Sequence, residues 1–130
     1  MLDTNICIYI LKNRTKELRQ RFKASRDICI SSVTYAELCF GIENGDNSLK
    51  TKRWSQLDLF TQNLEIMPWR ENEARQYGII RAYLKKQGIP IGNNDLLISA
   101  HARSLDIILV TNNEREFNRV PKLVIENWVD

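Results

Sequence analysis

The chain has 130 residues, enough for one domain with a sizeable hydrophobic core, and residues 1–130 are expected to form a single domain. Its apolar fraction of 43%, charged fraction of 27% and net charge of +3 are typical of a soluble protein and permit an anionic partner. No apolar run is long enough to span a membrane, and Asp3 interrupts any signal-peptide pattern. We therefore expect a cytoplasmic protein without a membrane partner.

The histidine and cysteine content excludes several classes of site. A single histidine, His101, rules out paired-imidazole catalysis and a histidine-rich zinc site. It lies six positions after Asp95, so on a helix the two side chains point apart, and we interpret His101 as a packed or half-exposed helix residue. Cys7, Cys29 and Cys39 are widely spaced among apolar residues and have no zinc spacing, which indicates buried thiols in a reducing compartment.

The N-terminal segment places an acid ahead of an apolar stretch. Asp3 precedes a helical pattern over residues 4–11, and its local interpretation is a helix N-cap. In the basic segment that follows, a helix is predicted over residues 16–24, with Leu18 and Phe22 on its buried face. Two interpretations stay open for its charges, a solvated helix face or a surface that contacts phosphates. The candidate contacts are Lys12, Arg14, Arg19 and Arg21.

The middle of the chain alternates between predicted strands and helices. We expect a strand over residues 27–31 and then a helix whose start carries a capping-box pattern, Thr34 to Glu37. The cap explains Glu37, although Glu37 also lies just past a strand end, where α/β sheets build active sites. A turn-rich break over residues 41–48 precedes a helix over residues 49–63. The candidates for the buried face of that helix are Trp54, Leu57, Leu59 and Phe60.

A long helix is the clearest element of the next segment. A short strand over residues 64–68 precedes this helix, which is predicted over residues 71–87 and ends at Gly88, a residue suited to that position. Its apolar band is predicted to be Ala74, Tyr77, Ile80 and Leu84.

The C-terminal third contains the strand around which the sheet is expected to form. A helix with Asn93 or Asn94 as its N-cap places Asp95 in the first turn. The apolar run 107–110 shows no alternation, which predicts a strand buried on both faces in a parallel sheet. A polar loop over residues 111–116 follows, and a last strand is expected over residues 121–128 at the sheet edge. The pattern predicts an α/β fold with three layers, α/β/α, around a central, mostly parallel sheet.

Four acids fall at helix starts or in loops beside strand ends: Asp3, Glu37, Asp95 and Glu116. If they converge, two carboxylates about 5 Å apart repel by roughly 3 kcal/mol at an effective dielectric near 20, and a proton or a cation must offset that repulsion. Oxygen ligands without nitrogen or sulfur suit Mg²⁺ or Mn²⁺, and such an ion supports phosphodiester cleavage. Composition and spacing make this one hypothesis for the acids.

Four motifs, LDTNICIY, SSVTYAEL, IGNNDLLISAHA and LVTNNEREF, occur in this order along the chain. With this spacing the chain resembles a PIN-domain ribonuclease over essentially its whole length, and more closely a VapC-type toxin of a bacterial toxin–antitoxin pair. The resemblance implies that Asp3 and Asp95 hold Mg²⁺, or Mn²⁺ as a substitute, and that Glu37 completes the inner site. Glu116 is then a more distant fourth carboxylate. The residues expected to orient the carboxylates are Asn5, Thr111 and Asn113.

The same resemblance implies an endoribonuclease that inhibits translation, forms a homodimer and is neutralised by a small VapB-type antitoxin. Its expected substrate is tRNA, with the initiator tRNA as one candidate. The first strand departs from the family pattern, because only Met1 and Leu2 precede the first acid. That strand is short, or the natural start lies upstream.

The alternative enzyme is a PIN-domain ribonuclease of RNA processing outside toxin–antitoxin pairs. A phospho-accepting receiver domain fits poorly, because Asp3 stands alone and no lysine follows the late strand. A purely structural interaction protein would leave the four acids unexplained.

Overall fold

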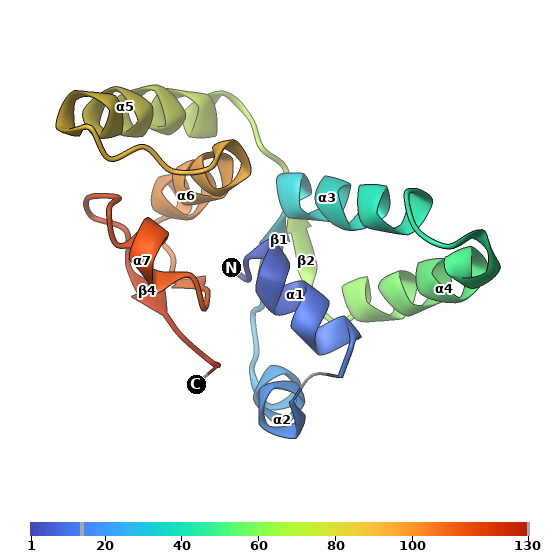
Figure 1. Ribbon diagram of the computed structural model, residues 1–130. Helices are drawn as coiled ribbons and strands as arrows, with labels where there is room; N and C mark the ends of the chain where they lie inside the picture. Colours follow the sequence, from blue (N-terminus) through green and yellow to red (C-terminus); the bar gives the residue numbers. More distant parts are fainter. Residues whose placement is uncertain (14, 130) are drawn as a thin grey trace.

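The computed structural model describes residues 1–13 and 15–129, and Figure 1 shows the arrangement of its elements. The helices of this part of the chain are α1 (Thr4–Leu11), α2 (Lys16–Ala24), α3 (Ser32–Glu43), the short 3-10 helix η1 (Asn47–Leu49), α4 (Lys50–Thr61), α5 (Glu71–Gln87), α6 (Asn93–Leu105) and α7 (Glu114–Phe117). The strands are β1 (Cys29–Ser31), β2 (Glu65–Met67), β3 (Leu109–Val110) and β4 (Ile125–Glu126).

The strands form two parallel pairs, which the N-terminal residues join. β1 pairs with β2, and β3 pairs with β4. The Leu2 N–H donates to the Cys29 carbonyl at 2.9 Å, and the Val110 N–H donates to the Met1 carbonyl at 2.7 Å. The order across the sheet is therefore β2, β1, the N-terminal segment, β3 and β4. The N-terminus lies in the middle of the molecule beside β1 (Figure 1).

Alternating side chains of these central strands face two separate hydrophobic clusters. Leu2, Ile30 and Val110 belong to a core that also includes residues of α1, α2, α3 and α4. Their neighbours Met1, Cys29 and Leu109 belong to a second core formed with α6 and Phe117. Successive residues of a strand point to opposite faces, so the sheet is covered on both sides. The predicted three-layer α/β/α fold with a central parallel sheet is confirmed.

Several element boundaries agree with the local sequence signals. The predicted helix over residues 16–24 is confirmed as α2, and the predicted helix over residues 71–87 as α5. Gly88 follows α5 in the left-handed conformation, with φ of 69°, as its position after a helix predicted. Asp3 is the N-cap of α1 and accepts a hydrogen bond from the Ile6 N–H. The fully buried state of His101 confirms that this residue packs in the core.

The predicted start of α3 is wrong. Ser31 caps this helix through a hydrogen bond from the Val33 N–H, so Thr34 lies inside the first turn and Glu37 lies beyond it. The helix also continues through Gly41 to Glu43, into the segment predicted as a break. Ser31 is the N-cap because β1 ends at this residue and the chain turns there into α3. Glu37 consequently has no capping role to explain its presence.

The C-terminal strands are shorter than the predictions. Ile108 is 45% exposed, and only Leu109 and Val110 of the apolar run form a strand buried on both faces. The polar loop after it contains α7, so Glu116 lies on a short helix. The last strand is reduced to β4 and occupies the predicted sheet edge. Gly92, not Asn93 or Asn94, is the N-cap of α6, although Asp95 does lie in its first turn.

Two predicted buried faces each contain one wrong residue. Leu59 on α4 is 62% exposed, whereas Leu57 and Phe60 are buried. On α5 the buried position is Glu73 instead of the exposed Ala74. Periodicity favoured alanine because a buried carboxylate needs a partner that no local pattern reveals.

Among the described residues, no helix is both long and apolar enough to cross a lipid bilayer.

The two glycines that bracket the second half of α5 give a matched test of backbone conformation. Added methyl groups at Gly78 and Gly88 would meet no atom within 4 Å, so substitution changes only the backbone preference. Gly88→Ala is expected to lower the free energy of unfolding by about 1 kcal/mol, and thus the melting temperature by about 3–5 °C, because φ is positive. Gly78→Ala should raise the free energy of unfolding by about 0.5–1 kcal/mol. Thermal unfolding measures both, and equal shifts would contradict the conformational argument.

Candidate active site

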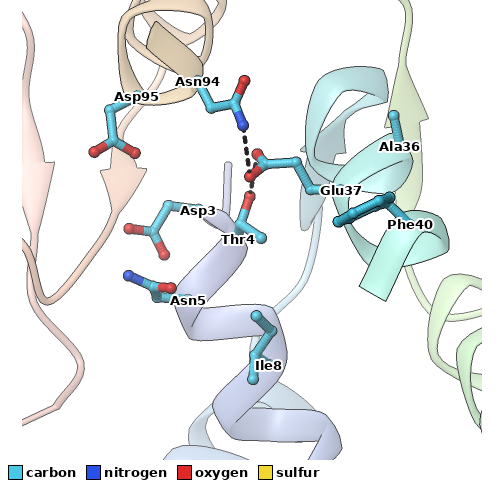
Figure 2. A pocket seen from close by; sticks show the side chains of 9 residues that line it. All are labelled: Asp3, Thr4, Asn5, Ile8, Ala36, Glu37, Phe40, Asn94 and Asp95. Atoms are coloured by element: carbon cyan, nitrogen blue, oxygen red, sulfur yellow. Dashed lines mark hydrogen bonds between the residues drawn. The ribbon is translucent and has the colours of Figure 1, made fainter. Parts of the chain in front are cut away.

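One cavity of about 540 Å³ collects three of the four predicted acids (Figure 2). Asp3 comes from the start of α1, Glu37 from the second turn of α3 and Asp95 from the first turn of α6. The cavity is lined by Asp3, Thr4, Asn5, Ile8, Ala36, Glu37, Phe40, Asn94 and Asp95. Residues far apart in the sequence thus meet beside the N-terminal segment of the sheet.

Asp3 is the most buried of the acids, with 3% of its surface exposed. Its Oδ1 accepts the Ile6 N–H at 2.8 Å, and its Oδ2 accepts a short hydrogen bond from the Thr111 hydroxyl. Burial is the main cause that raises the pKa of Asp3, while the Thr111 and Ile6 hydrogen bonds act in the opposite direction. Asp3 is therefore held rigidly although it carries a carboxylate that burial disfavours.

Asp95 and Glu116 form a pair of interacting carboxyl groups. Burial raises the pKa of Asp95 to about 7, and Glu116 raises it further through a hydrogen bond and through charge repulsion. The same hydrogen bond lowers the pKa of Glu116, assisted by Asn113. The Asn113 amide donates to Glu116 Oε2 at 2.9 Å and lies 3.5 Å from Asp95 Oδ2. Below about pH 7 the two acids thus share a proton, which Asp95 holds.

Glu37 is oriented differently from the two aspartates. The Thr4 hydroxyl donates to Glu37 Oε1 at 2.9 Å, and the Asn94 amide donates to Oε2 at 3.0 Å. Figure 2 shows the carboxylate between Thr4 and Asn94, with Asp3 and Asp95 on the other side of the cavity. Both oxygens therefore have neutral donors. The sequence analysis assigned neither Thr4 nor Asn94 to the site, although Thr4 directly follows Asp3 and Asn94 directly precedes Asp95.

The donor set fits a hard divalent cation. Among residues 1–13 and 15–129, no three side chains of His, Cys, Asp or Glu are grouped closely enough to enclose an ion. Mg²⁺ needs no such enclosure, because it commonly uses one or two carboxylates and keeps several waters. Asp3 and Asp95 offer two carboxylates in one cavity, each with a pKa raised by burial, so a cation would offset the charge that burial disfavours. The residues therefore fit Mg²⁺ or Mn²⁺.

Two of the other polar residues predicted to orient the carboxylates contact the acids directly. Thr111 bonds to Asp3 and also accepts the Asn113 N–H at 2.9 Å, so the β3–α7 connection is ordered around the site. Asn113 connects Asp95 and Glu116 as described above. Asn5 lines the cavity next to Asp3 (Figure 2).

The predicted phosphate contacts lie outside this cavity. Lys12 lines a neighbouring groove, and Arg19 lies on the exposed surface of α2. The Arg21 guanidinium is engaged within the chain, because it forms an ion pair with Glu126 and lies over the Trp128 ring at 4.9 Å. Arg14 lies outside the described residues.

Comparison with known proteins identifies the family. A family model described as "PIN domain" matches residues 1–123. The chain belongs to the PIN-domain family. This PIN domain is 45% identical over 130 residues to "Ribonuclease VapC2" of Haemophilus influenzae, with 99% of the chain and 97% of the relative covered. It is 41% identical over 129 residues to the "tRNA(fMet)-specific endonuclease VapC" of Shigella flexneri, with 98% and 96% covered.

Solved structures support the same conclusion. The chain superimposes with a TM-score of 0.92 and 39% identity on the crystal structure of VapBC2 from Rickettsia felis bound to a promoter DNA fragment, covering 99% of this chain and 98% of that one. For DNA-bound VapBC from Salmonella typhimurium the TM-score is 0.94 at 38% identity, with 99% and 97% covered. The resemblance to VapC-type PIN domains expected from the four motifs is confirmed.

The raised pKa of Asp95 predicts how the stability of the metal-free PIN domain depends on pH. The folded chain keeps a proton on Asp95 up to about pH 7, whereas an unfolded aspartate loses it near pH 4. The raised pKa of Asp95 therefore contributes fully to the free energy of unfolding below about pH 4, and this contribution is lost as the pH rises through about 7. Asp95→Asn should remove this loss, so the variant melts about 3–5 °C higher at pH 8 in excess chelator, which corresponds to about 1 kcal/mol.

The controls for this prediction separate charge from metal binding. Asp58→Asn changes an exposed aspartate of α4 and should leave the melting temperature unchanged at pH 8 in excess chelator. Added Mg²⁺ should raise the melting temperature of the wild type more than that of Asp95→Asn. The same pH dependence in wild type and Asp95→Asn would contradict the assignment.

Proposed function

We propose that the chain is a metal-dependent endoribonuclease that acts as the toxin of a toxin–antitoxin pair. The observation that carries the proposal is the cavity in which Asp3 and Asp95 face one another within a PIN domain. The ribonuclease names of its relatives support the reaction. Residues 1–130 act as one PIN domain, in the cytoplasm.

The chain's own residues prepare the site for phosphodiester cleavage. When bound, Mg²⁺ or Mn²⁺ supplies an activated water and stabilises the leaving oxygen. Asp3 and Asp95 would hold the ion, and Glu37 would complete the inner site from the opposite wall. Thr111 keeps Asp3 in one rotamer, and Asn113 keeps Asp95 beside Glu116. Glu116 then acts at longer range as a fourth carboxylate.

An RNA substrate suits the remaining walls of the cavity. Ile8, Ala36 and Phe40 form an apolar side opposite the aspartates, and Phe40 is 67% exposed. Exposed aromatic side chains provide stacking surfaces for the unpaired bases of RNA. The substrate is tRNA, with the initiator tRNA as a candidate because one relative is named for tRNA(fMet). Cleavage of tRNA would inhibit translation.

A groove beside the cavity supports an antitoxin partner. It has a volume of about 230 Å³ and an apolar lining that includes Leu11, Leu38 and Ile42. Ile8 and Glu37 line both the groove and the cavity, so the two are adjacent. An amphipathic helix of a VapB-type antitoxin fits such a groove and could extend to the acids. Structures of relatives contain VapBC pairs.

The exposed face of α5 supports a homodimer. Ile79 is 55% exposed and Tyr83 is 42% exposed, and they lie about one turn apart on this helix. Exposed apolar groups of this kind favour contact with a second protein surface.

The alternative function is a PIN-domain ribonuclease of RNA processing outside toxin–antitoxin pairs. Co-purification of a small antitoxin encoded beside the chain would decide between them.

Loss of any one of the three cavity acids should abolish Mg²⁺-dependent RNA cleavage. Asp3→Asn, Glu37→Gln and Asp95→Asn each remove one carboxylate, and their effects should not add, because the three groups form one site. Cleavage of tRNA by the purified chain measures the loss, and growth after expression should recover in parallel. Asp58→Asn is the control and should cleave as wild type does. Full activity of Asp95→Asn would refute the assignment of the site.

The basic helix α2 should contribute to RNA binding through Arg19. In an inactive Asp95→Asn background, Arg19→Gln should lower the slope of log binding constant against log salt concentration. The expected decrease is that of about one phosphate contact, because fewer counterions are released. Arg21→Gln is the matched comparison and should change the slope less, because Arg21 pairs with Glu126. An unchanged slope in Arg19→Gln would mean that α2 is only a solvated face.

A further inference from the structure

The only histidine of the chain lies in a buried polar cluster that the proposed catalytic site does not use. His101 on α6 is 0% exposed, and its Nδ1 lies 2.8 Å from the hydroxyl of Ser31 at the start of α3. Its Nε2 lies 3.5 Å from Oε1 of Glu73 on α5, which is 6% exposed. The three groups therefore connect three helices in the interior.

The hydrogen-bonding groups of Ser31 define the state of this imidazole. The Ser31 oxygen already accepts the Val33 N–H at 3.0 Å, so its hydroxyl proton is free to donate to His101 Nδ1. When Ser31 donates to Nδ1, the proton of a neutral imidazole lies on Nε2, 3.5 Å from the Glu73 carboxylate, and Nε2 has no hydrogen-bond partner among the described residues. Burial lowers the pKa of His101, with Glu73 acting in the opposite direction, in keeping with a neutral ring.

Among the described residues, the Ser31–His101 contact is one of two side-chain hydrogen bonds between the segments that carry Glu37 and Asp95. The other is the hydrogen bond from Asn94 to Glu37 at the cavity. The two contacts are separated by about 9 Å along α3 and about 10 Å along α6, at 1.5 Å per residue. Ser31 precedes Glu37 whereas His101 follows Asn94, so the helices run in opposite directions across the contact. A shift at the buried contact would therefore move Glu37 relative to Asp95.

We propose that His101 is a positioning residue, whose hydrogen bond with Ser31 sets the separation of α3 and α6 and thereby the geometry of the Asp95 and Glu37 carboxylates for a divalent cation. The Glu73 carboxylate, 3.5 Å from Nε2, favours a proton on that nitrogen. His101 Nε2 and Glu73 Oε2 have no hydrogen-bond partner among the described residues, so burying these two groups costs free energy that the packing of the core does not explain. This inference rests on the proposed metal-dependent nuclease.

The fold has an independent tie between the same two helices. The Trp69 N–H donates to the Ser32 hydroxyl at 3.1 Å, and the Trp69 indole donates to the Leu97 carbonyl at 3.0 Å. Trp69 therefore links the start of α3 to the middle of α6 without His101. Variants at position 101 are therefore expected to fold.

Nuclear magnetic resonance of the wild-type chain tests the proposal without any substitution. Because there is one histidine, long-range ¹H–¹⁵N spectra contain one imidazole. We expect a neutral ring with the proton on Nε2 at pH 7, and both ring nitrogen signals should shift as Mg²⁺ saturates the chain. The Asp95→Asn variant should show no such shift. Ring signals that stay fixed in saturated wild-type protein would overturn the proposal.

Two substitutions separate the two sides of the ring. His101→Asn places an amide near Nδ1 and keeps the Ser31 contact, whereas His101→Gln places an amide near Nε2 and keeps the Glu73 contact. Titration calorimetry with Mg²⁺ and Mn²⁺ measures the metal affinity of each variant. We expect His101→Gln to bind these ions about 10-fold or more weakly than the wild type, and His101→Asn to stay within about 3-fold of it. Melting in chelator measures the stability of each variant separately.

The outcomes distinguish this inference from the proposed function. Equal metal affinities in the two variants, or affinities that follow their melting temperatures, would mean that His101 is only a packing residue. If the wild-type chain binds neither Mg²⁺ nor Mn²⁺, both the proposed nuclease and the role of His101 fail. Normal metal binding and RNA cleavage with no difference between Asn and Gln would overturn the inference alone.

Discussion

The insertion of the N-terminal segment between β1 and β3 is the constraint on which the site depends. The backbone of Met1 to Asp3 bonds to Cys29 on one side and to Ile108 and Val110 on the other. In the described part of the chain, these bonds join the two parallel strand pairs into one sheet. Since Asp3 ends this segment and caps α1, the same bonds hold the first acid at the middle of the sheet edge. The backbone bonds that join the sheet therefore also position Asp3 in the site.

Burial makes this site a place where negative charge is costly. The pKa of Asp3 and that of Asp95 are both raised, with burial as the leading cause, and repulsion between the acids adds to it. A proton shared by Asp95 and Glu116 relieves this strain in the metal-free chain. A divalent cation would do the same while keeping every acid ionised. A proton and a bound cation would thus compete for the same carboxyl groups.

Neutral donors hold the acids in place without cancelling their charge. Thr111 bonds to Asp3, Asn113 lies between Asp95 and Glu116, and Thr4 with Asn94 holds Glu37. A lysine or arginine in these positions would pair with the carboxylates and weaken their attraction for a cation. Hydroxyl and amide groups fix the rotamers while leaving the charge available. Deeper in the core, Ser31 and His101 extend the same kind of neutral contact between α3 and α6.

The sequence by itself determined the family, the three acids that meet at the cavity and the helices whose ends carry strong local signals. Four short motifs sufficed for the first two, and Gly88 and the apolar spacing sufficed for α5, because these features depend on neighbours within a few residues. Only the tertiary structure decided that Ser31 caps α3, that Glu73 replaces Ala74 in the core and that Arg21 is paired with Glu126. The last two depend on groups distant in the sequence, and a local pattern carries no information about which element will lie opposite; the Ser31 cap depends on where β1 ends. The direction of the Glu37 carboxylate belongs to the same class, since Thr4 and Asn94 reach it only after α1, α3 and α6 have packed.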